Sequence, residues 1–373
     1  MKIVHVIVGL DRGGAEAMLR NLVLFSKANK HVVVSLTTKG ALGDELERNG
    51  VAVFPLGGGS FLSLPLIFLR LVRIFRAESP DVVQTWMVHS DFIGGMAARV
   101  SGVPHVVWGV RTTDYSIEGR SARVLRWLCA RLSPLIPSRI VSAARASAAA
   151  SVEAGYCAEK IVVIPNGFDI AALEKNKGQG RLIRRRVGIK ENELVIGCMG
   201  RYNPAKDHLN FIKAAGIVAA KCPTARYLMV GRGLVDSNRE LIAHIEQTGF
   251  PERFFLLGER SDSFSCLDAM NIFVLSSCTE GFPNVLGEAM IMGVPCVSTD
   301  VGDAAFILGN AGELVPPRDS SALAAAVERL IEMSPSERLM VGQRGRDRVA
   351  HEFSIAQGVR KFDELYLALA GNR

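Results

Sequence analysis

The sequence lacks the features that mark several common classes of protein. Its seven cysteines include no C-x-x-C pair, and no histidine lies at zinc-site spacing, so neither a disulfide framework nor a metal site is predicted. The longest apolar run, residues 61–69, is interrupted by Pro65 and is far shorter than the roughly 20 residues of a membrane-spanning helix. The first residues contain no signal-peptide cleavage site. We therefore expect a cytoplasmic protein.

Acidic residues are also scarce in the first half of the chain. The net charge is +7, and residues 1–175 carry 20 Lys and Arg against 14 Asp and Glu. One window without any acidic residue contains six arginines: Arg120, Arg123, Arg126, Arg131, Arg139 and Arg145. Such a patch favours an anionic membrane surface or a phosphorylated acceptor as partner, although a solvated helix face explains any single arginine more simply. No aromatic-rich basic motif accompanies the charge, so nucleic acid is not an expected partner.

What the sequence does contain is a regular alternation of short β-branched runs with helical patterns. Seven such runs lie within residues 1–165, among them KIVHVIV, HVVVSLT and DVVQTW, and five follow, among them ELVIGCMG and NIFVLSS. Strands separated by helices predict parallel sheets covered on both faces. The predicted fold class is therefore α/β, with two Rossmann-like, doubly wound domains at residues 1–170 and 171–355.

Glycines follow the first predicted strand, in the stretch GLDRGGAE. Gly13 and Gly14 open a helix, and their lack of side chains lets backbone N–H groups approach an anion or a sugar. The stretch is not G-x-G-x-x-G, which weakens a dinucleotide-binding interpretation, and packing alone explains it equally well. His89 follows the strand DVVQTW, in an expected loop, where a lone histidine is more often structural than catalytic.

Two cations follow the predicted strand that ends at Gly200. Arg201 and Lys206 lie at the carboxyl end of this strand, where open α/β sheets bind ligands. Arginine offers a fork of donors and lysine a point charge, which together suit a diphosphate. Taken alone, such a pair is more often part of a surface loop.

Two carboxylates, Glu280 and Glu288, flank the apolar stretch EGFPNVLGEAMIMG. Pro283 suits the first turn of a helix, so the N–H groups that follow it are expected to be free. Glu288 then falls on this helix among apolar residues. A carboxylate in such a setting needs hydrogen-bond donors, and a ribose diol would supply two. The simpler alternative is that Glu288 complements the helix dipole.

Together these stretches resemble the family-4, retaining glycosyltransferases of the GT-B fold, in the branch that builds bacterial surface polysaccharides. The resemblance spans nearly the whole chain, and its most specific motifs are E-x7-E at Glu280 and Glu288 and R-x4-K at Arg201 and Lys206. It implies two domains that face each other across a cleft, and a terminal helix at residues 356–373 that packs back on the first domain. The chain departs from the family at Asp207, where glycine is usual.

The resemblance also implies a role for each motif. Arg201 and Lys206 would bind the donor diphosphate and stabilise the charge on the leaving nucleotide. Glu288 would hold the ribose, and Glu280 would contact the transferred sugar near His89. The further donor-binding residues implied are Gly13, Gly14, Gly258, Gly281, Phe282, Pro283, Asn284 and Val285. No cofactor or metal is expected, because the chain contains no D-x-D triplet to hold a cation on the diphosphate.

The predicted protein is a retaining hexosyltransferase. It would move a sugar from a nucleotide-diphosphate sugar, with UDP favoured over GDP, to a hydroxyl of a glycan or lipid-linked acceptor in surface polysaccharide or lipid-linked glycan assembly. It would act in the cytoplasm or peripherally on the inner face of the membrane. The alternatives are a nucleotide-sugar epimerase and a non-catalytic nucleotide-sugar-binding scaffold, whereas the absent G-x-G-x-x-G disfavours an NAD-dependent oxidoreductase.

Overall fold

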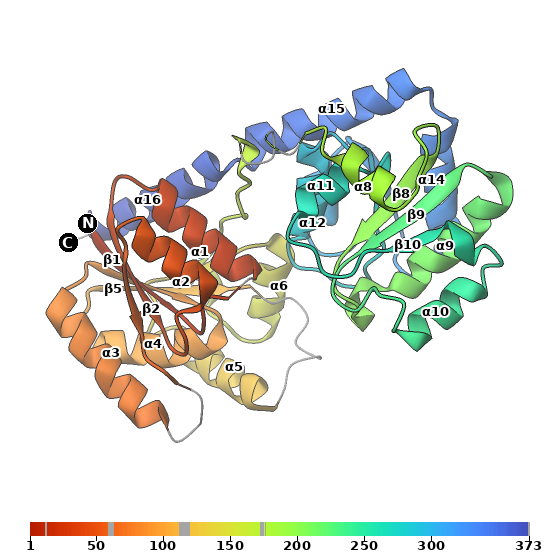
Figure 1. Cartoon of the computed structure of the whole chain (residues 1–373). Coiled ribbons are helices and arrows are strands. Elements are labelled where there is room, and N and C mark those ends of the chain that lie inside the picture. Colours follow the sequence, from red (N-terminus) through yellow and green to blue (C-terminus); the bar gives the residue numbers. More distant parts are fainter. Residues whose placement is uncertain (12, 59–62, 112–119, 172–174, 176, 372–373) are drawn as a thin grey trace. The chain divides into compact units, whose positions relative to one another are not determined.

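The computed structural model describes residues 1–373 except 12, 59–62, 112–119, 172–174, 176 and 372–373. The chain forms two compact units: unit 1 comprises Met1–Gly167 and Ile355–Arg373, and unit 2 comprises Phe168–Ser354. Each unit is a parallel sheet with helices on both faces (Figure 1). The prediction of two Rossmann-like, doubly wound domains is therefore confirmed.

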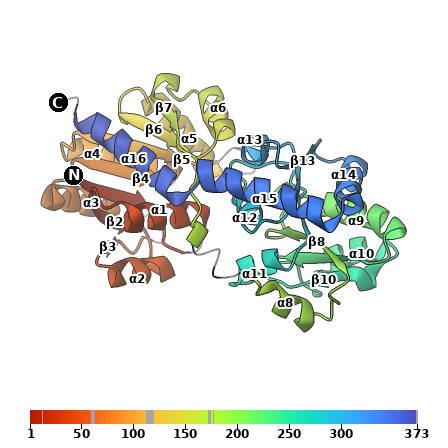
Figure 2. The same ribbon diagram turned by 90° about the horizontal axis from the view of Figure 1, so that it is seen from above.

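The sheet of unit 1 has the strand order β3-β2-β1-β4-β5-β6-β7. The strands are β1 (Lys2–Ile7), β2 (Lys30–Ser35), β3 (Ala52–Pro55), β4 (Val82–Trp86), β5 (His105–Val110), β6 (Arg139–Ser142) and β7 (Ile161–Val163). Figure 2 shows them from β7 at the top to β3 at the bottom. The order of the strands reverses between β1 and β4, so the switch point at which doubly wound sheets bind ligands lies there.

Two helical layers cover this sheet, because alternate strand residues point to opposite faces. Ile3 and Ile7 pack toward α1 (Gly14–Phe25), α2 (Gly40–Arg48) and the terminal helix α16 (Ile355–Ala370). Val4 and Val6 pack toward α3 (Leu64–Glu78), α4 (Val88–Val100) and α5 (Arg120–Leu132), which lie side by side (Figure 1). A further helix, α6 (Arg145–Glu153), precedes β7.

The terminal helix α16 is bound to unit 1 by both apolar and polar contacts. Phe362 and Tyr366 are fully buried among residues of β1, β4 and α1. Asp363 accepts hydrogen bonds from Ser26 Oγ at 2.8 Å and Asn29 Nδ2 at 2.7 Å. The last segment of the chain therefore completes one layer of the first unit.

The sheet of unit 2 has the order β10-β9-β8-β11-β12-β13, with its switch point between β8 and β11. Its strands are β8 (Leu194–Met199), β9 (Ala225–Val230), β10 (Phe254–Leu256), β11 (Ile272–Leu275), β12 (Cys296–Thr299) and β13 (Gly312–Val315). Five of the six were predicted. The edge strand β13, with the sequence GELV, was missed because a four-residue run containing glycine and glutamate has no clear apolar period.

The helices of unit 2 form two layers around this sheet. One layer contains α9 (His208–Lys221), α10 (Arg239–Glu246) and α14 (Ser320–Glu332). The other contains α8 (Gly180–Arg186), α11 (Ser263–Asp268), α12 (Asn284–Ile291), α13 (Ala304–Leu308) and α15 (Pro335–Glu352). Within the parts of the chain that the structure describes, no helix is both long and apolar enough to span a membrane.

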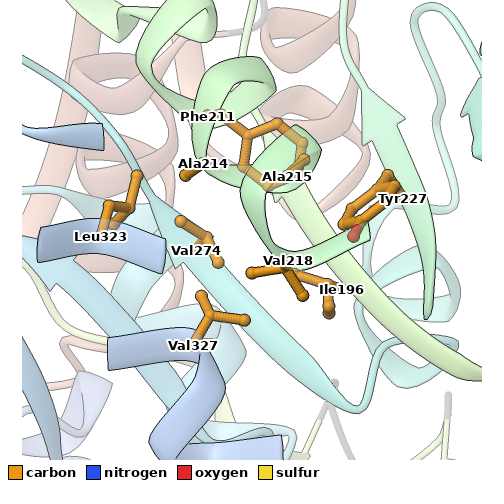
Figure 3. A pocket seen from close by; sticks show the side chains of 9 residues that line it. All are labelled: Ile196, Phe211, Ala214, Ala215, Val218, Tyr227, Val274, Leu323 and Val327. Atoms are coloured by element: carbon orange, nitrogen blue, oxygen red, sulfur yellow. The ribbon is translucent and has the colours of Figure 1, made fainter. Parts of the chain in front are cut away.

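A small cavity lies between the sheet of unit 2 and the layer of α9 and α14. Figure 3 shows its hydrophobic lining, which comes from β8, β9, β11 and these two helices. Its volume is about 10 Å³, at the lower limit of the space that one water molecule needs. The cavity is therefore a minor packing gap, too small for a ligand larger than one water molecule.

Candidate functional site

The two motifs of unit 2 meet at its switch point. Strand β8 leads into Arg201 and a 3₁₀ turn at Pro204–Lys206, and strand β11 leads into the loop that contains Glu280. Lys206 Nζ lies 2.6 Å from Glu280 Oε1, and Ser277 Oγ donates to the same oxygen at 2.6 Å. The side chains of Lys206 and Glu280 are only 25% and 12% exposed, so this ion pair is partly shielded from solvent.

Hydrogen bonds to main-chain groups hold these two loops together. Ser276 Oγ donates to the Lys206 carbonyl at 3.0 Å, and the Cys278 N–H donates to the Ala205 carbonyl at 2.9 Å. Asn203 caps the 3₁₀ turn by accepting from the Ala205 N–H at 2.8 Å. The position of Lys206 against Glu280 is thus fixed by the main chain as well as by charge.

The conformation and hydrogen bonding of Asp207 explain how aspartate can replace the usual glycine at this position. Its backbone adopts the left-handed conformation, with φ +46° and ψ +54°, which glycine accepts most readily and which Asp tolerates better than most residues. Its side chain also caps α9, because Oδ1 accepts from the Asn210 N–H at 3.2 Å. Aspartate therefore supplies both the turn and the helix cap.

The loop after β12 supports Glu280 from the other side, a contact that the sequence interpretation missed. Gly302 has φ +55°, and a Cβ at this position would collide with the carbonyl oxygens of Glu280 and Gly281. The Asp303 N–H donates to the Gly281 carbonyl at 2.9 Å. The only sequence signal was the glycine in the stretch VGD after a predicted strand.

The stretch after Glu280 is anchored by aromatic packing. The ring of Phe282 stacks on the ring of Phe168, with 6.1 Å between the ring centroids. It also contacts Phe353 edge-on, with 5.9 Å between the centroids. Pro283 is the N-cap of α12, one position before the helical first turn in which it was expected. Asn284 and Val285 are the first two residues of this helix. Phe282 therefore fixes the direction in which α12 leaves the loop.

Glu288 lies one turn inside α12 and is half-buried. Of the residues that the structure describes, none donates a hydrogen bond to its carboxylate. Burial raises the pKa of Glu288 to about 7, because the ionised form loses water without gaining a partner. The carboxylate therefore lacks donors among the described residues, and the ribose contact stays a prediction.

The remaining predicted residues of unit 2 lie at the same edge of the sheet. Arg201 directly follows Gly200 at the end of β8 and is exposed. Gly258 follows β10, is buried and has φ +62°. Its N–H donates to the Leu234 carbonyl at 2.9 Å, and its own carbonyl accepts from the Gly231 N–H at 2.8 Å. Gly258 thus joins the turns that follow β9 and β10.

Three predicted site residues lie in unit 1. Gly13 and Gly14 begin a helix, as predicted, whereas His89 does not lie in a loop, where it was expected. Gly13 is the N-cap of α1 and Gly14 is its first residue. His89 is exposed in the first turn of α4, not in a loop, because the turn between β4 and α4 consists of Met87 alone. Met87 has φ +71° and ψ +156°, a conformation that costs a non-glycine residue about 1–3 kcal/mol.

Arg111, which the sequence interpretation did not select, lies at the carboxyl end of β5. Its guanidinium lies over the Trp86 ring, 4.7 Å from the ring centroid, and Nη1 donates to Asn166 Oδ1. Burial lowers the pKa of Arg111 to about 10. A single arginine after a strand carries no sequence signal of burial, so only the tertiary structure could identify it.

Two family models match most of the chain. Residues 12–172 match the family described as Glycosyltransferase Family 4, and residues 193–333 match the family described as Glycosyl transferases group 1. The chain therefore belongs to the glycosyltransferases of group 1 and family 4.

Individual relatives and a solved structure agree with this assignment. The chain is 26% identical to UDP-Gal:alpha-D-GlcNAc-diphosphoundecaprenol alpha-1,3-galactosyltransferase of Escherichia coli, over 82% of this chain and 80% of that protein. It is also 26% identical to the capsular polysaccharide biosynthesis glycosyltransferase CapM of Staphylococcus aureus, over 77% and 76%. The crystal structure of Anabaena Alr3699/HepE in complex with UDP matches with a TM-score of 0.85 at 23% identity, over 99% and 100%. The fold is GT-B.

Proposed function

We propose that this glycosyltransferase moves a hexose from a UDP-sugar to an acceptor hydroxyl with retention of the anomeric configuration. The observation that carries the proposal is the junction of Lys206 and Glu280 at the switch point of unit 2. It brings a cation for a diphosphate next to a carboxylate for sugar hydroxyls. The UDP complex and the UDP-galactose-dependent relative support UDP as the nucleotide.

The residues of unit 2 divide the donor between them. Arg201 and Lys206 bind the diphosphate and stabilise its charge as the bond to the sugar breaks. Glu280 accepts hydrogen bonds from sugar hydroxyls, and Lys206 and Ser277 hold it in place. Glu288 accepts from the ribose diol, which supplies the donors that its half-buried carboxylate lacks.

The reaction breaks the bond between the anomeric carbon and a diphosphate oxygen, and the acceptor oxygen forms its bond on the same face of the sugar. The departing phosphate oxygen takes the proton of the acceptor hydroxyl, so atoms and charges balance. Positioning and electrostatic stabilisation of an oxocarbenium-like transition state supply most of the rate. The cations and helix N-termini take the place of a metal ion on the diphosphate.

One face of unit 1 supports action at an anionic membrane, on a lipid-linked acceptor of surface polysaccharide assembly. On α5, Val124 and Trp127 are exposed, Trp127 by 57%, together with Arg123 and Arg131. The guanidinium of Arg131 lies over the Trp127 ring at 5.4 Å.

Helix α3 extends this face, since α4 contacts both α3 and α5. It exposes Leu66 and Leu69 beside Arg70 and Arg73. Arg126, one of the six arginines of the acid-free window, is buried and does not contribute. Exposed apolar side chains among cations suit the surface of an anionic bilayer.

The test is a screen of UDP- and GDP-sugars against the purified protein. Thermal shifts with UDP, GDP, ADP and NAD identify the nucleotide, and mass spectrometry detects sugar transfer to lipid extracts. NMR of the product gives the anomeric configuration. Protection by UDP followed by retained configuration in the product is the expected result. Sugar isomerised at the nucleotide stage, with no transfer to any acceptor, would contradict the proposal.

A further inference from the structure

Arg111 is held in one orientation by two neighbours. The Trp86 ring lies under its guanidinium at 4.7 Å, and Asn166 accepts from Nη1. Trp86 is fully buried, and its Nε1–H donates to His5 Nδ1 at 3.3 Å, so the ring cannot rotate freely. A planar guanidinium fixed on one face and at one corner presents its remaining donors in a defined direction.

One donor of Arg111, its Nε–H, is buried and has no acceptor among the residues that the structure describes. Glu16 and Asp91 are its carboxylate neighbours, but neither forms an ion pair with it, and Asp91 Oδ1 accepts instead from Thr85 Oγ1 and the Gly109 N–H. A buried donor without an acceptor is costly, and an anionic ligand would supply the acceptor that Nε lacks among the described residues.

Arg99 shows what a purely structural arginine looks like in the same unit. Its Nε donates to the Ile136 carbonyl at 2.8 Å and its Nη1 to the Pro104 carbonyl at 3.1 Å. These bonds tie the end of α4 to neighbouring loops. Arg111 makes no comparable use of its Nε, so anchoring the main chain does not explain why a half-buried arginine lies there.

Arg111 also lies where a ligand of unit 1 is expected. Strand β5 neighbours β4, which forms one side of the switch point, and parallel strands end at one edge of the sheet. The helices α1 and α4 begin at this same edge, with Gly13 and the strained Met87 as their N-caps. A guanidinium beside two helix N-termini provides the donors that phosphate oxygens accept.

We propose that Arg111 is a phosphate-binding residue of unit 1, presented by Trp86 and Asn166 to a diphosphate group at the carboxyl edge of the sheet. The proposal rests on the proposed function, because the nucleotide donor of that reaction carries a diphosphate and a lipid-linked acceptor can carry one. The diphosphate belongs either to the nucleotide donor or to a lipid-linked acceptor, and the same chemistry recognises both.

The experiment compares the wild type with Arg111→Gln, Arg111→Lys and the matched control Arg99→Gln. Isothermal titration measures the affinity for UDP, for inorganic pyrophosphate, and for geranyl diphosphate at saturating UDP. We expect Arg111→Gln to weaken at least one of these about 10- to 100-fold, the effect of losing hydrogen bonds to a charged group. Arg111→Lys should lose less, and Arg99→Gln should bind as the wild type does.

The pattern of losses identifies the source of the diphosphate. Weaker UDP binding assigns Arg111 to the donor, and weaker binding of geranyl diphosphate with unchanged UDP assigns it to the acceptor. Wild-type affinities in a folded Arg111→Gln variant overturn the proposal, as does a wild type that binds none of the three probes. If Arg111→Gln does not fold, wild-type affinities in Arg111→Lys for all three probes count against the fork of donors. If the wild type binds pyrophosphate but not UDP, the proposed function fails, and a loss of pyrophosphate affinity in Arg111→Gln still supports phosphate binding by Arg111.

Discussion

Replacing Glu288 by glutamine should stabilise the protein while weakening its ligand affinity. The pKa of Glu288 rises from 4.5 to about 7 because burial disfavours the ionised carboxylate. At 1.36 kcal/mol for each tenfold change in proton affinity, the rise corresponds to about 3 kcal/mol. This is an upper estimate, since the half-buried carboxylate keeps some water.

The sign of the effect depends on pH. Between pH 4.5 and 7 the folded state binds more protons at Glu288 than the unfolded state does, so the contribution of this residue to stability falls as pH rises through about 7. At pH 8 the wild type is destabilised by the full cost of burying the ionised carboxylate, and Glu288→Gln removes this cost. At pH 5 most of the difference between the two proteins should have disappeared.

Urea unfolding at pH 5 and pH 8 measures this difference, with Glu246→Gln on the exposed face of α10 as the matched control. The three tryptophans, Trp86, Trp108 and Trp127, lie in unit 1. Tryptophan fluorescence therefore follows unit 1, while circular dichroism follows both units. We expect Glu288→Gln to raise the stability measured by circular dichroism at pH 8 and to leave the fluorescence transition of unit 1 unchanged.

The same variant should bind UDP about tenfold more weakly, because an amide oxygen replaces a charged acceptor for the ribose. A variant that is more stable at pH 8 and binds more weakly is the signature of a site that sacrifices stability for its ligand. Equal stabilities of wild type and variant at both pH values would refute the reasoning about burial. Unchanged UDP affinity would refute the ribose contact.

Three further predictions concern other parts of the structure. Lys206→Ala should weaken diphosphate binding, whereas Glu280→Ala should spare UDP protection and abolish transfer. In a double-mutant cycle on the free energy of unfolding, the two substitutions should show a coupling of about 0.5–3 kcal/mol, and additive effects would contradict the ion pair. Asp207→Ala should destabilise unit 2 by about 1–3 kcal/mol in urea, through a lost cap and a strained turn, and Asp207→Gly by clearly less. Trp127→Ser should lower binding to phosphatidylglycerol vesicles in sedimentation by about fivefold or more, with little effect on the weak binding to phosphatidylcholine; equal binding of wild type and variant to both would argue against the membrane face.

Much of the fold could be predicted from local sequence. The β-branched runs and the helical periods between them correctly gave all the strands of unit 1 and five of unit 2, because strands buried on both faces must be apolar along their length. Strand β13 was not predicted, because an edge strand that contains Gly312 and Glu313 has no such pattern. The prediction of a loop at His89 was wrong, because the one-residue connection through Met87 needs a backbone conformation that the sequence does not indicate.

The candidate site was only partly visible in the sequence. The spacing of Glu280 and Glu288 fixed one in a loop and the other on a helix, as the structure has them. The roles assigned to them remain predictions. The sequence did not predict the contact of Gly302 with Glu280 or the half-buried position of Arg111, because each depends on contacts with residues far away in the chain.

The sequence alone determined which segments form strands and helices, and hence two doubly wound sheets, because these depend on residue periods within short windows. It also fixed which residues follow each strand. Tertiary structure decided the rest: strand order placed β8 beside β11, which brings Lys206 within 2.6 Å of Glu280 across a separation of 74 residues. It also set how much water each charge loses, and so raised the pKa of Glu288 to about 7 and left the buried Nε of Arg111 without an acceptor among the described residues.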